Sequence, residues 1–549
     1  MQPTLGIDLG TTNCAVARAE QSGVEQAGVE VLGIPQLVNP GEVRAEPLFP
    51  SSLYLPGPSE FAPGALALPW DENPPYLTGE LAKKRGAENP SRLVHSAKSW
   101  LAVAGDMPHV TAVEATRAYL AHLRAATPNF DAHNVLITVP ASFDAAARDL
   151  TLQAAQQAGY PTPVLLEEPQ AAFYAWLERH PDWRERIHPG ALILVIDIGG
   201  GTTDFTLIRV TDQSGDLTLE RIAVGEHILL GGDNMDLALA RAVEAEMPKL
   251  DAAQLHALWQ RCRVAKEKLL APGSTQTEEP VTILGRGTGL IGGTLKGVLR
   301  RSTLEQVLLD GFLPPAEATD VPPRPRRAAL QEVGLPYASD PAITRHLAAF
   351  LRGQQPTHVL FNGGVLNAPL VRERLLSVLN SWLPAPVEVL SGEDLMHAVA
   401  RGAAYYGLAR QGRGLRIRGG VPRTYYLGIE SAMPAVPGFP PPMKALTVVP
   451  FGLEEGSAVA LPKYEFALRT GEPAEFRFFS STTRKEDQPG DLLDPIPPGV
   501  EELAPMEVTL SGAPARVSLE AQVTETGMLE IYCVATSGER WKLEFNLRS

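Results

Sequence analysis

The chain contains 549 residues, of which 44% are hydrophobic, and its 63 acidic and 48 basic residues give a formal net charge of −15. This length exceeds what one hydrophobic core supports, so several structural units are expected. The acidic balance argues against general binding to nucleic acid or to anionic membranes. The sequence also holds no run of about 20 apolar residues that could cross a bilayer.

The residues at the amino terminus lack the basic segment of a secretory signal, and Asp8 interrupts the short apolar run that follows them. Cys14, Cys262 and Cys533 lie too far apart along the chain to indicate a zinc knuckle or a disulfide framework. These features predict a cytoplasmic protein.

The first motif is a turn that follows an apolar strand predicted for residues 5–7. It places a carboxylate at the strand end, then a glycine that lets backbone N–H groups approach an anion, then side chains that can donate hydrogen bonds. A second β-type segment, residues 15–17, comes directly after the turn. The residues of this predicted phosphate loop are Asp8, Gly10, Thr11, Thr12 and Asn13.

Beyond this motif, strands and helices alternate as far as about residue 410, which predicts an α/β region. Residues 35–75 are rich in proline and are expected to form an elaboration on the surface. Residues 145–158 have the spacing of a helix.

The motif returns near the middle of the chain, after an apolar strand predicted for residues 192–196. Its residues are Asp197, Gly199, Gly200, Gly201, Thr202 and Asp204. A Walker loop or a Rossmann fingerprint would open a helix after the glycines, whereas both motifs here run into a strand. Two unrelated glycine-rich hairpins are the alternative, but they would hardly share the Asp and Thr positions. Two facing loops of this kind would clamp one polyphosphate.

After the second loop, residues 217–224 are expected to form a strand and residues 236–246 a helix. Residues 314–336 contain too many prolines for a helix or a central strand, and they too are expected on the surface. After residue 412 the sequence changes to short alternating segments, which predicts a separate all-β domain of roughly 120 residues. Residues 413–420 alternate apolar and basic side chains, as a solvated linker or a short docking strand would.

Taken together, these segments resemble the Hsp70 chaperone family. The resemblance rests on the segments GIDLGTTN, VPASFDAAARDLTLQAAQQAGY, EEPQAAFYAW, IDIGGGTTDF, LGGD, NGGV and AVARGAAYYG. It implies an actin-like ATPase fold with two duplicated RNase H-like lobes over residues 1–408, a linker over 409–422 and a β-sandwich over 423–549. The family's helical lid has no counterpart in this sequence.

The resemblance also implies roles for individual residues. Asp8 and Asp197 would face Mg²⁺, largely through water, with K⁺ nearby. The catalytic residues would be Lys98, Glu168, Asp197, Thr202 and Asp204. Phosphate contacts would come from Gly10, Thr11, Thr12, Asn13, Gly199, Gly200, Gly201 and Thr202, and Gly231 and Gly232 would also bind the nucleotide. In such a site positioning and charge stabilisation carry the chemistry, so hydrolysis of ATP to ADP is expected to be slow without a partner.

The nucleoside end departs from the family pattern. Lys266, Gly363 and Gly364 match the residues that contact ribose and adenosine. The arginine that stacks on adenine is replaced by Asn367, and the acid and serine that flank the lysine are replaced by Arg263 and Leu270. Met396 replaces an aspartate. Losing these contacts predicts nucleotide binding weaker by about two decades and altered base selectivity.

Coupling between domains would use Pro140 and Arg148, together with Leu415 and Ile417 in the linker. The expected partners are unfolded polypeptide, a J-domain co-chaperone and a nucleotide-exchange factor. The alternatives are a small-molecule kinase of the same superfamily, an actin-like assembling ATPase and a pseudo-ATPase. A kinase would gain nothing from an appended β domain, and the retained Lys98, Glu168 and Thr202 argue against the pseudo-ATPase.

Overall fold

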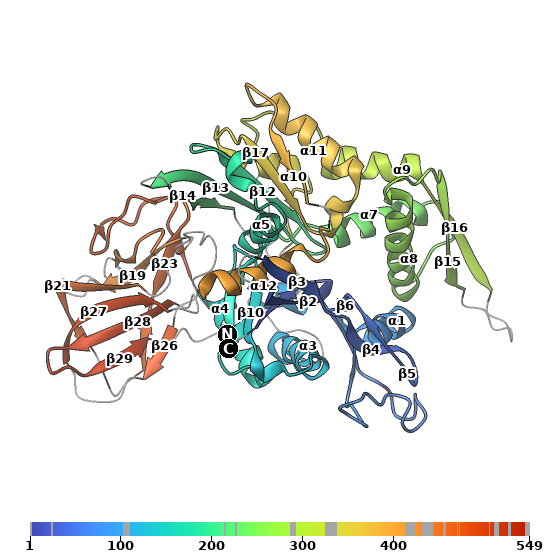
Figure 1. Ribbon diagram of the computed structural model, residues 1–549, viewed down its shortest axis with the longest axis horizontal. Helices are drawn as coiled ribbons and strands as arrows, with labels where there is room; N and C mark the ends of the chain where they lie inside the picture. The colour runs from blue at the N-terminus through green and yellow to red at the C-terminus, as the bar shows by residue number, and fades with distance from the viewer. Residues whose placement is uncertain are drawn as a thin grey trace, which may run out of the picture.

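In the computed structural model two mixed sheets with their helices form an α/β region, and an all-β region follows (Figure 1). The residues that the structure describes are 3–22, 26–102, 110–213, 216–225, 228–285, 293–323, 337–392, 394–411, 421, 423–430, 443–453, 457–468, 470, 473–503, 506–509, 515–524 and 529–543. Leu415 and Ile417 lie outside these residues.

The first sheet has the strand order β11-β10-β1-β2-β3, and the short strand β6 also pairs with β2. Its strands are β1 (Thr4–Leu9), β2 (Asn13–Ser22), β3 (Gln26–Val31), β6 (Phe49–Pro50), β10 (Asn134–Val139) and β11 (Val164–Glu167). Strand β2 is antiparallel to both β1 and β3, whereas β10 and β11 run parallel to β1.

The second sheet repeats this order as β14-β13-β12-β17-β18, with the same strand directions. Its strands are β12 (Leu192–Ile198), β13 (Thr203–Gln213), β14 (Asp216–Val224), β17 (His358–Asn362) and β18 (Glu388–Leu390). Because the order and the directions agree, the turns after β1 and β12 occupy equivalent places in their sheets.

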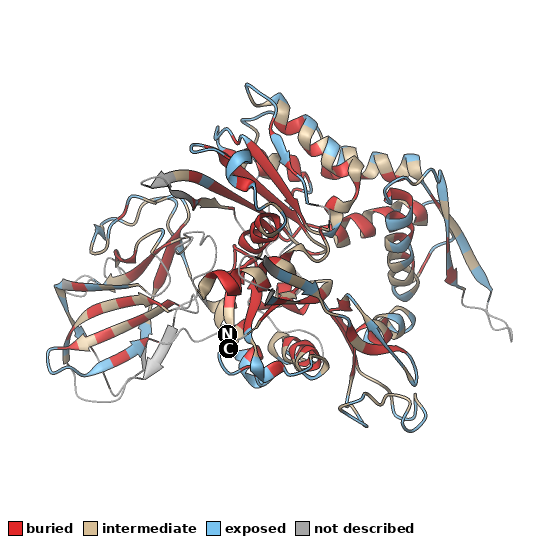
Figure 2. Ribbon diagram, in the orientation of Figure 1, coloured by how far each residue is buried: buried red, intermediate tan, exposed pale blue. Residues whose placement is uncertain are grey.

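The helices that follow the two sheets exchange places. Helix α5 (Glu168–Arg179) follows the first sheet but also packs on β12 and β17, while α12 (Ala398–Arg410) follows the second sheet and packs on β1, β2 and β10. Both helices lie between the sheets in Figure 1, and Figure 2 shows their buried faces. Gly402 lets them touch, because a Cβ there would overlap the carbonyl oxygen of Ala171.

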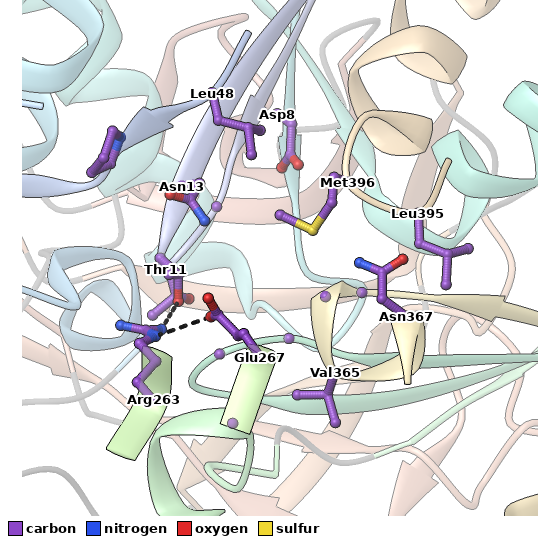
Figure 3. Close-up of a pocket in the computed structure, with 18 of the residues that line it drawn as sticks. Asp8, Thr11, Asn13, Leu48, Arg263, Glu267, Val365, Asn367, Leu395 and Met396 are labelled. Atoms are coloured by element: carbon purple, nitrogen blue, oxygen red, sulfur yellow. Dashed lines mark hydrogen bonds and ion pairs between the residues drawn. The ribbon is translucent and has the colours of Figure 1, made fainter. Parts of the chain in front are cut away.

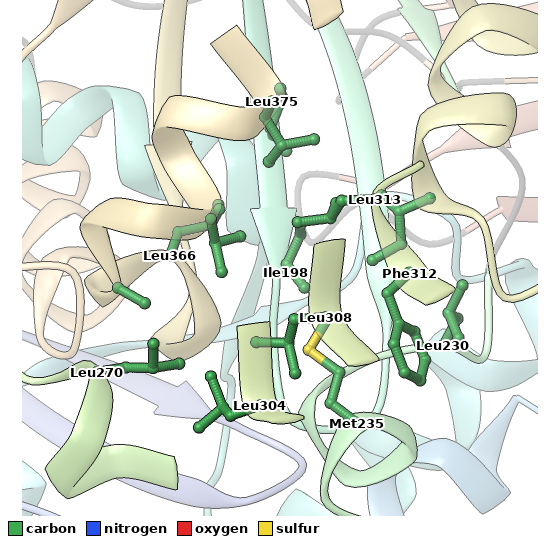
Figure 4. Packing of buried hydrophobic residues seen from close by; sticks show 14 of the residues in the cluster. Ile198, Leu230, Met235, Leu270, Leu304, Leu308, Phe312, Leu313, Leu366 and Leu375 are labelled. Atoms are coloured by element: carbon green, nitrogen blue, oxygen red, sulfur yellow. The ribbon is translucent and has the colours of Figure 1, made fainter. Parts of the chain in front are cut away.

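Each sheet with its helices forms one lobe. Each lobe carries an inserted unit between the third and fourth strands of its sheet, which are β3 and β10 in the first lobe and β14 and β17 in the second. The first contains β4 (Ile34–Asn39), β5 (Glu42–Glu46), β6, β7 (Ser52–Tyr54), β8 (Leu77–Thr78), α1 (Glu80–Glu88), β9 (Leu93–His95), α2 (Ala97–Leu101) and α3 (Ala112–Ala126). The second contains α7 (Gly232–Glu244), α8 (Ala252–Leu270), β15 (Glu278–Leu284), β16 (Thr294–Arg300), α9 (Arg301–Gln306), a π-helical turn (Val307–Phe312) and α10 (Ile343–Leu351). Leucines of the second insertion pack beneath β12 in one core with Ile198 and Leu366 (Figure 4).

The remaining helices of the α/β region are short to medium in length. They are α4 (Ala145–Gln157), α6 (Trp183–Arg186), α11 (Pro369–Ser381) and the 3₁₀ turns Pro90–Arg92, Phe130–Ala132 and Gly364–Asn367. Helix α4 confirms the prediction for residues 145–158 and begins where the Asp144 carboxylate accepts the N–H of Ala147. Helix α7 begins four residues earlier than predicted, because the Asn234 side chain accepts the N–H of Gly231. Strand β14 confirms the prediction for residues 217–224.

The prediction that residues 35–75 lie on the surface is wrong for their first part. Phe49, Leu53 and Tyr54 are fully or almost fully buried. Strands β6 and β7 pair with β2 and with β9, so Phe49 and Leu53 join the core beneath α3, while Tyr54 packs in a smaller cluster with Leu77 and Leu81. Proline is tolerated there because these are short or edge strands. Residues 56–75 are half-buried or exposed, and residues 314–323 form neither helix nor strand, as predicted.

Among its described residues the carboxy-terminal region contains no helix, and its regular elements are all strands. They are β19 (Thr424–Glu430), β20 (Met443–Val449), β21 (Ala458–Leu468), β22 (Pro473–Phe476), β23 (Phe478–Ser481), β24 (Leu492–Leu493), β25 (Glu501–Glu502), β26 (Met506–Thr509), β27 (Ala515–Val523), β28 (Leu529–Ala535) and β29 (Arg540–Leu543). The sheets β24-β20-β19-β23-β25 and β21-β27-β28-β29 share one hydrophobic core, and β22 pairs with β26. Lys485 of this region donates a hydrogen bond to the carbonyl of Ile222 in β14, so the two regions touch.

Among the described helices, none combines the length and the apolar character needed to cross a membrane.

Candidate functional site

The two predicted loops face each other across one cavity of about 820 Å³ between the lobes. Asp8 and Asp197 stand at the carboxyl ends of β1 and β12, and both line the cavity. The loops approach closely, since a Cβ on Gly200 would overlap the Thr12 hydroxyl. A Cβ on Gly201 would lie 2.9 Å from the Thr11 methyl carbon. Glycine at these positions is therefore required by the approach of the opposite lobe.

Most of the predicted site residues line this cavity. They are Asp8, Gly10, Thr11, Thr12, Asn13, Lys98, Glu168, Asp197, Gly199, Gly200, Thr202, Gly232, Lys266, Gly363, Gly364 and Asn367. Figure 3 shows Asp8 and Asn13 facing Asn367 and Met396 across it. Gly201, Asp204 and Gly231 lie behind the lining. A Cβ on Gly231 would lie 2.7 Å from the carbonyl oxygen of Gly200, so Gly231 lets the start of α7 pack under the loop.

Each loop carboxylate is held by a residue of the neighbouring fourth strand. The Thr138 hydroxyl of β10 lies 3.3 Å from Asp8 Oδ1, and the Asn362 amide of β17 donates to Asp197 Oδ2 at 2.6 Å. Thr138 and Asn362 occupy equivalent positions in the two sheets. The sequence reasoning missed both, although the parallel segments VLIT and VLFN would have revealed them.

Lys98 and Glu168 form a buried ion pair inside the cavity. Lys98 lies on α2 and Glu168 begins α5, and their side chains are 6% and 13% exposed. Asp204, which is outside the cavity lining, accepts a hydrogen bond of 2.5 Å from Ser142, another residue that sequence reasoning missed. The structure therefore brings together the predicted lysine and acid, which come from segments far apart in the sequence.

Burial and mutual repulsion perturb these charged groups. Burial raises the pKa of Asp8 to about 7, with a further contribution from Glu168. Burial also holds the pKa of Asp197 well above its ordinary range, and Glu168 again adds to the shift. Burial by itself would lower the pKa of Lys98, but Glu168 and Asp8 raise it above its ordinary value. The cavity thus concentrates carboxylates, and a bound cation would favour their charged forms.

The chemistry of this donor set fits a magnesium ion accompanied by a polyphosphate. Mg²⁺ is usually held by one or two carboxylates, several waters and phosphate oxygens, and Asp8 and Asp197 supply the carboxylates. The adjoining Gly10 leaves no space for a side chain, because a Cβ would overlap the carbonyl oxygen of Asn13. The tight backbone turn that results is suited to binding a phosphate group.

The far end of the cavity is mostly apolar. Leu270, Val365, Leu395 and Met396 line it together with Asn367. Gly363 has a φ of 90°, and a Cβ there would overlap the carbonyl oxygen of Ile198, so only glycine fits. Lys266 is held within its own lobe, since its Nζ lies 2.7 Å from Asp236 Oδ1.

Of the predicted coupling residues, Pro140 and Arg148 lie within the described part of the chain. Pro140 directly follows β10, and Arg148 of α4 donates to Glu167 Oε1 at 2.6 Å. Glu167 also pairs with Arg221 of β14, so one buried carboxylate lies between cations of the two lobes. Glu167 immediately precedes Glu168, and no local sequence pattern indicated this arrangement.

A family model described as Hsp70 protein matches residues 76–314 of the chain. Similar curated proteins are named chaperone protein HscA homolog. That of Cupriavidus necator is 32% identical over 287 residues, which are 49% of this chain and 42% of the relative. That of Bordetella pertussis is 28% identical over 433 residues, which are 73% of this chain and 57% of the relative.

The chain therefore spans about half the length of the curated relatives that it matches. The family match covers elements of both lobes, including Lys98, Glu168 and the second loop. Combined with the facing loops, these similarities support a relationship to the Hsp70 family.

Proposed function

We propose that the protein is an ATP-dependent chaperone that binds and hydrolyses ATP to regulate its hold on unfolded polypeptide. The observation that carries this proposal is the pair of loops, at equivalent ends of two matching sheets, that face one cavity. The family match supports the same function. ATP and ADP are the proposed nucleotides.

The finer architecture is part of the proposal. The shared strand order of the two sheets is that expected of duplicated RNase H-like lobes in an actin-like ATPase. We assign residues 1–408 to this nucleotide-binding domain, residues 409–422 to a linker, and residues 423–549 to a β-sandwich. The common core of the two carboxy-terminal sheets supports the sandwich.

Within the cavity, Asp8 and Asp197 would hold Mg²⁺ largely through water, with K⁺ as a further counter-ion. A bound Mg²⁺ supplies positive charge that neutralises phosphate oxygens. Gly10, Asn13, Gly199, Gly200 and Gly201 would bring backbone or amide donors to the phosphates. The hydroxyls of Thr11, Thr12 and Thr202 would donate beside them.

Lys98 and Glu168 would act as a unit at the terminal phosphate. The Lys98 ammonium would stabilise charge that develops there, and it holds the Glu168 carboxylate in place. The free lone pairs of Glu168 would orient the attacking water, while Asp204, fixed by Ser142, supports the loop. None of these groups forms a covalent bond to the substrate, so turnover depends on positioning and is expected to be slow.

Extended polypeptide would bind to the β-sandwich, and Pro140 and Arg148 would relay the nucleotide state to it, with Leu415 and Ile417 in the linker. A J-domain co-chaperone and a nucleotide-exchange factor would accelerate the cycle. The contact between Lys485 and β14 supports coupling, because it joins the β region to the lobe that carries the second loop. We place this activity in the cytoplasm.

Calorimetric titration with ATP, ADP and GTP in the presence of Mg²⁺ tests the nucleotide site, and a turnover assay with a reduced, unfolded polypeptide tests the chaperone function. We expect ATP and ADP to bind and the polypeptide to stimulate ATP hydrolysis. An Asp8→Asn variant serves as the site control and should lose turnover. Binding without stimulation by any unfolded polypeptide would contradict the chaperone assignment, and absence of nucleotide binding would contradict the whole proposal.

A further inference from the structure

Arg263 reaches from the second lobe to the phosphate loop of the first. It lies on α8, which is packed against α7 through Leu258, Cys262 and other apolar residues. Its Nη2 lies 3.4 Å from the hydroxyl oxygen of Thr12. A Cβ built on Gly200 would lie 3.6 Å from the same nitrogen. The guanidinium therefore stands where the two loops meet.

The side chain is held in this place by acidic neighbours on its own lobe. Its Nη2 pairs with Asp233 Oδ1 at 3.1 Å, and its Nε lies 3.7 Å from Asp236 and 3.8 Å from Glu267. Only 18% of the side chain is exposed, and it lines the same cavity as Asp8 and Lys98. Figure 3 shows it at the edge of that cavity, beside Glu267.

This arrangement leaves donors available to a ligand. A guanidinium has five N–H groups, and within the described part of the chain Nη1 of Arg263 makes no hydrogen bond or ion pair. The Thr12 hydroxyl accepts from Arg263, so its own proton is free to be donated elsewhere. Both groups can therefore present hydrogens to an anion between the loops.

Arg263 also alters the balance of charge at the cavity. Lys98 is already paired with Glu168, and Lys266 with Asp236. A polyphosphate needs more positive charge than a single magnesium ion supplies. A planar guanidinium matches phosphate oxygens bidentately, which an ammonium cannot do.

We propose that Arg263 is a phosphate-binding residue, which contacts the nucleotide's polyphosphate directly and orients the Thr12 hydroxyl toward it. The inference rests on the proposed function and deepens it, because it assigns to the second lobe a cation that recognises the phosphates rather than the nucleoside. The ligand class is a nucleoside di- or triphosphate.

The test compares nucleotides that differ in phosphate content. We expect Arg263→Gln to weaken the binding of ATP and ADP about 10- to 100-fold, while the affinity for adenosine stays unchanged, because a charge-assisted contact is lost at one end of the ligand only. Arg263→Lys should show an intermediate loss, since it keeps the charge but not the planar fork. Calorimetry with ATP, ADP, AMP and adenosine measures each affinity.

Arg261→Ala is the matched control, because Arg261 is exposed on the same helix and lies outside the cavity lining. It should bind all four ligands as the unchanged protein does. Thermal melting checks that Arg263→Gln and Arg263→Lys fold. An equal loss for adenosine and ATP would show a structural role only, and unchanged ATP affinity would overturn the inference while leaving the proposed function intact. A wild-type protein that binds none of these nucleotides would overturn both.

Discussion

The sheets of the two lobes have the same strand order, but the units inserted into the two sheets differ. Each sheet places a carboxylate at the end of its first strand and a supporting residue on its fourth, Asp8 with Thr138 and Asp197 with Asn362. The cations come from the insertions, since Lys98 lies on α2 of the first and Arg263 on α8 of the second. The repeated scaffold thus determines where the acids stand, and the insertions determine which cations line the cavity.

The sharpest test of this difference removes the cation of the first lobe. We expect Lys98→Ala to lower ATP turnover by about 100- to 1,000-fold, as loss of a preorganised charged group at a developing charge usually does, while Mg-ATP binding stays measurable. Steady-state turnover and calorimetry measure the two effects. Lys249→Ala, an exposed lysine outside the cavity lining, is the control. Unchanged turnover would remove Lys98 from the mechanism.

A second test removes the carboxylate that pairs with cations of both lobes. Glu167 is buried between Arg148 of the first lobe and Arg221 of the second. We expect Glu167→Gln to lower the free energy of unfolding by about 3 kcal/mol, because it leaves buried cations without their counter-charge. Denaturant titration measures the change. The exposed pair of Glu246 and Arg300 is the control, and Glu246→Gln should cost less than about 1 kcal/mol. Equal losses in the free energy of unfolding would show that the ion pairs between the lobes stabilise the protein no more than an exposed ion pair does.

A third test concerns the helices that the lobes exchange. We expect Gly402→Ala to destabilise the protein by about 2 kcal/mol, since the new methyl group would overlap the carbonyl of Ala171 and force α5 and α12 apart. The melting temperature reports the loss. Gly311→Ala is the matched control, because no atom lies within 4 Å of a Cβ built there. A Gly402→Ala protein as stable as the control would show that the helix crossing tolerates separation.

The smallest expected effect is a loss of stability in acid that arises from the first insertion. His122 is buried between the Thr78 hydroxyl and the carbonyl of Pro35, and burial lowers its pKa to about 4. Below its ordinary pKa of about 6.5, the unfolded chain binds a proton that the folded chain does not, so stability falls as the pH drops from 6.5 toward 4. Between pH 7.5 and 5.5 we expect a loss of about 1 kcal/mol from this residue.

Urea titrations at the two pH values test this expectation. A His122→Asn variant should be less stable at pH 7.5 but should lose less on acidification, because asparagine does not titrate. An identical pH dependence in the variant would assign the acid sensitivity to other groups.

The proline-rich segment shows where sequence reasoning reached its limit in the fold. Its composition indicated a surface elaboration, yet Phe49 and Tyr54 are buried. Composition describes the average of a segment, whereas burial depends on which short strand finds a partner. The β6 and β7 pairings join residues that are distant in sequence, such as Cys14 with Phe49 and Ser52 with His95. No local pattern contains that information.

The sequence by itself determined the two loops, the alternation of strands and helices and the change to an all-β region, because each of these is written in contiguous residues. Only the tertiary structure decided which side chains meet. Lys98 pairs with Glu168, Arg263 reaches Thr12, and Glu167 lies between Arg148 and Arg221. These contacts join segments from separate elements, and their approach depends on how the sheets, insertions and exchanged helices pack.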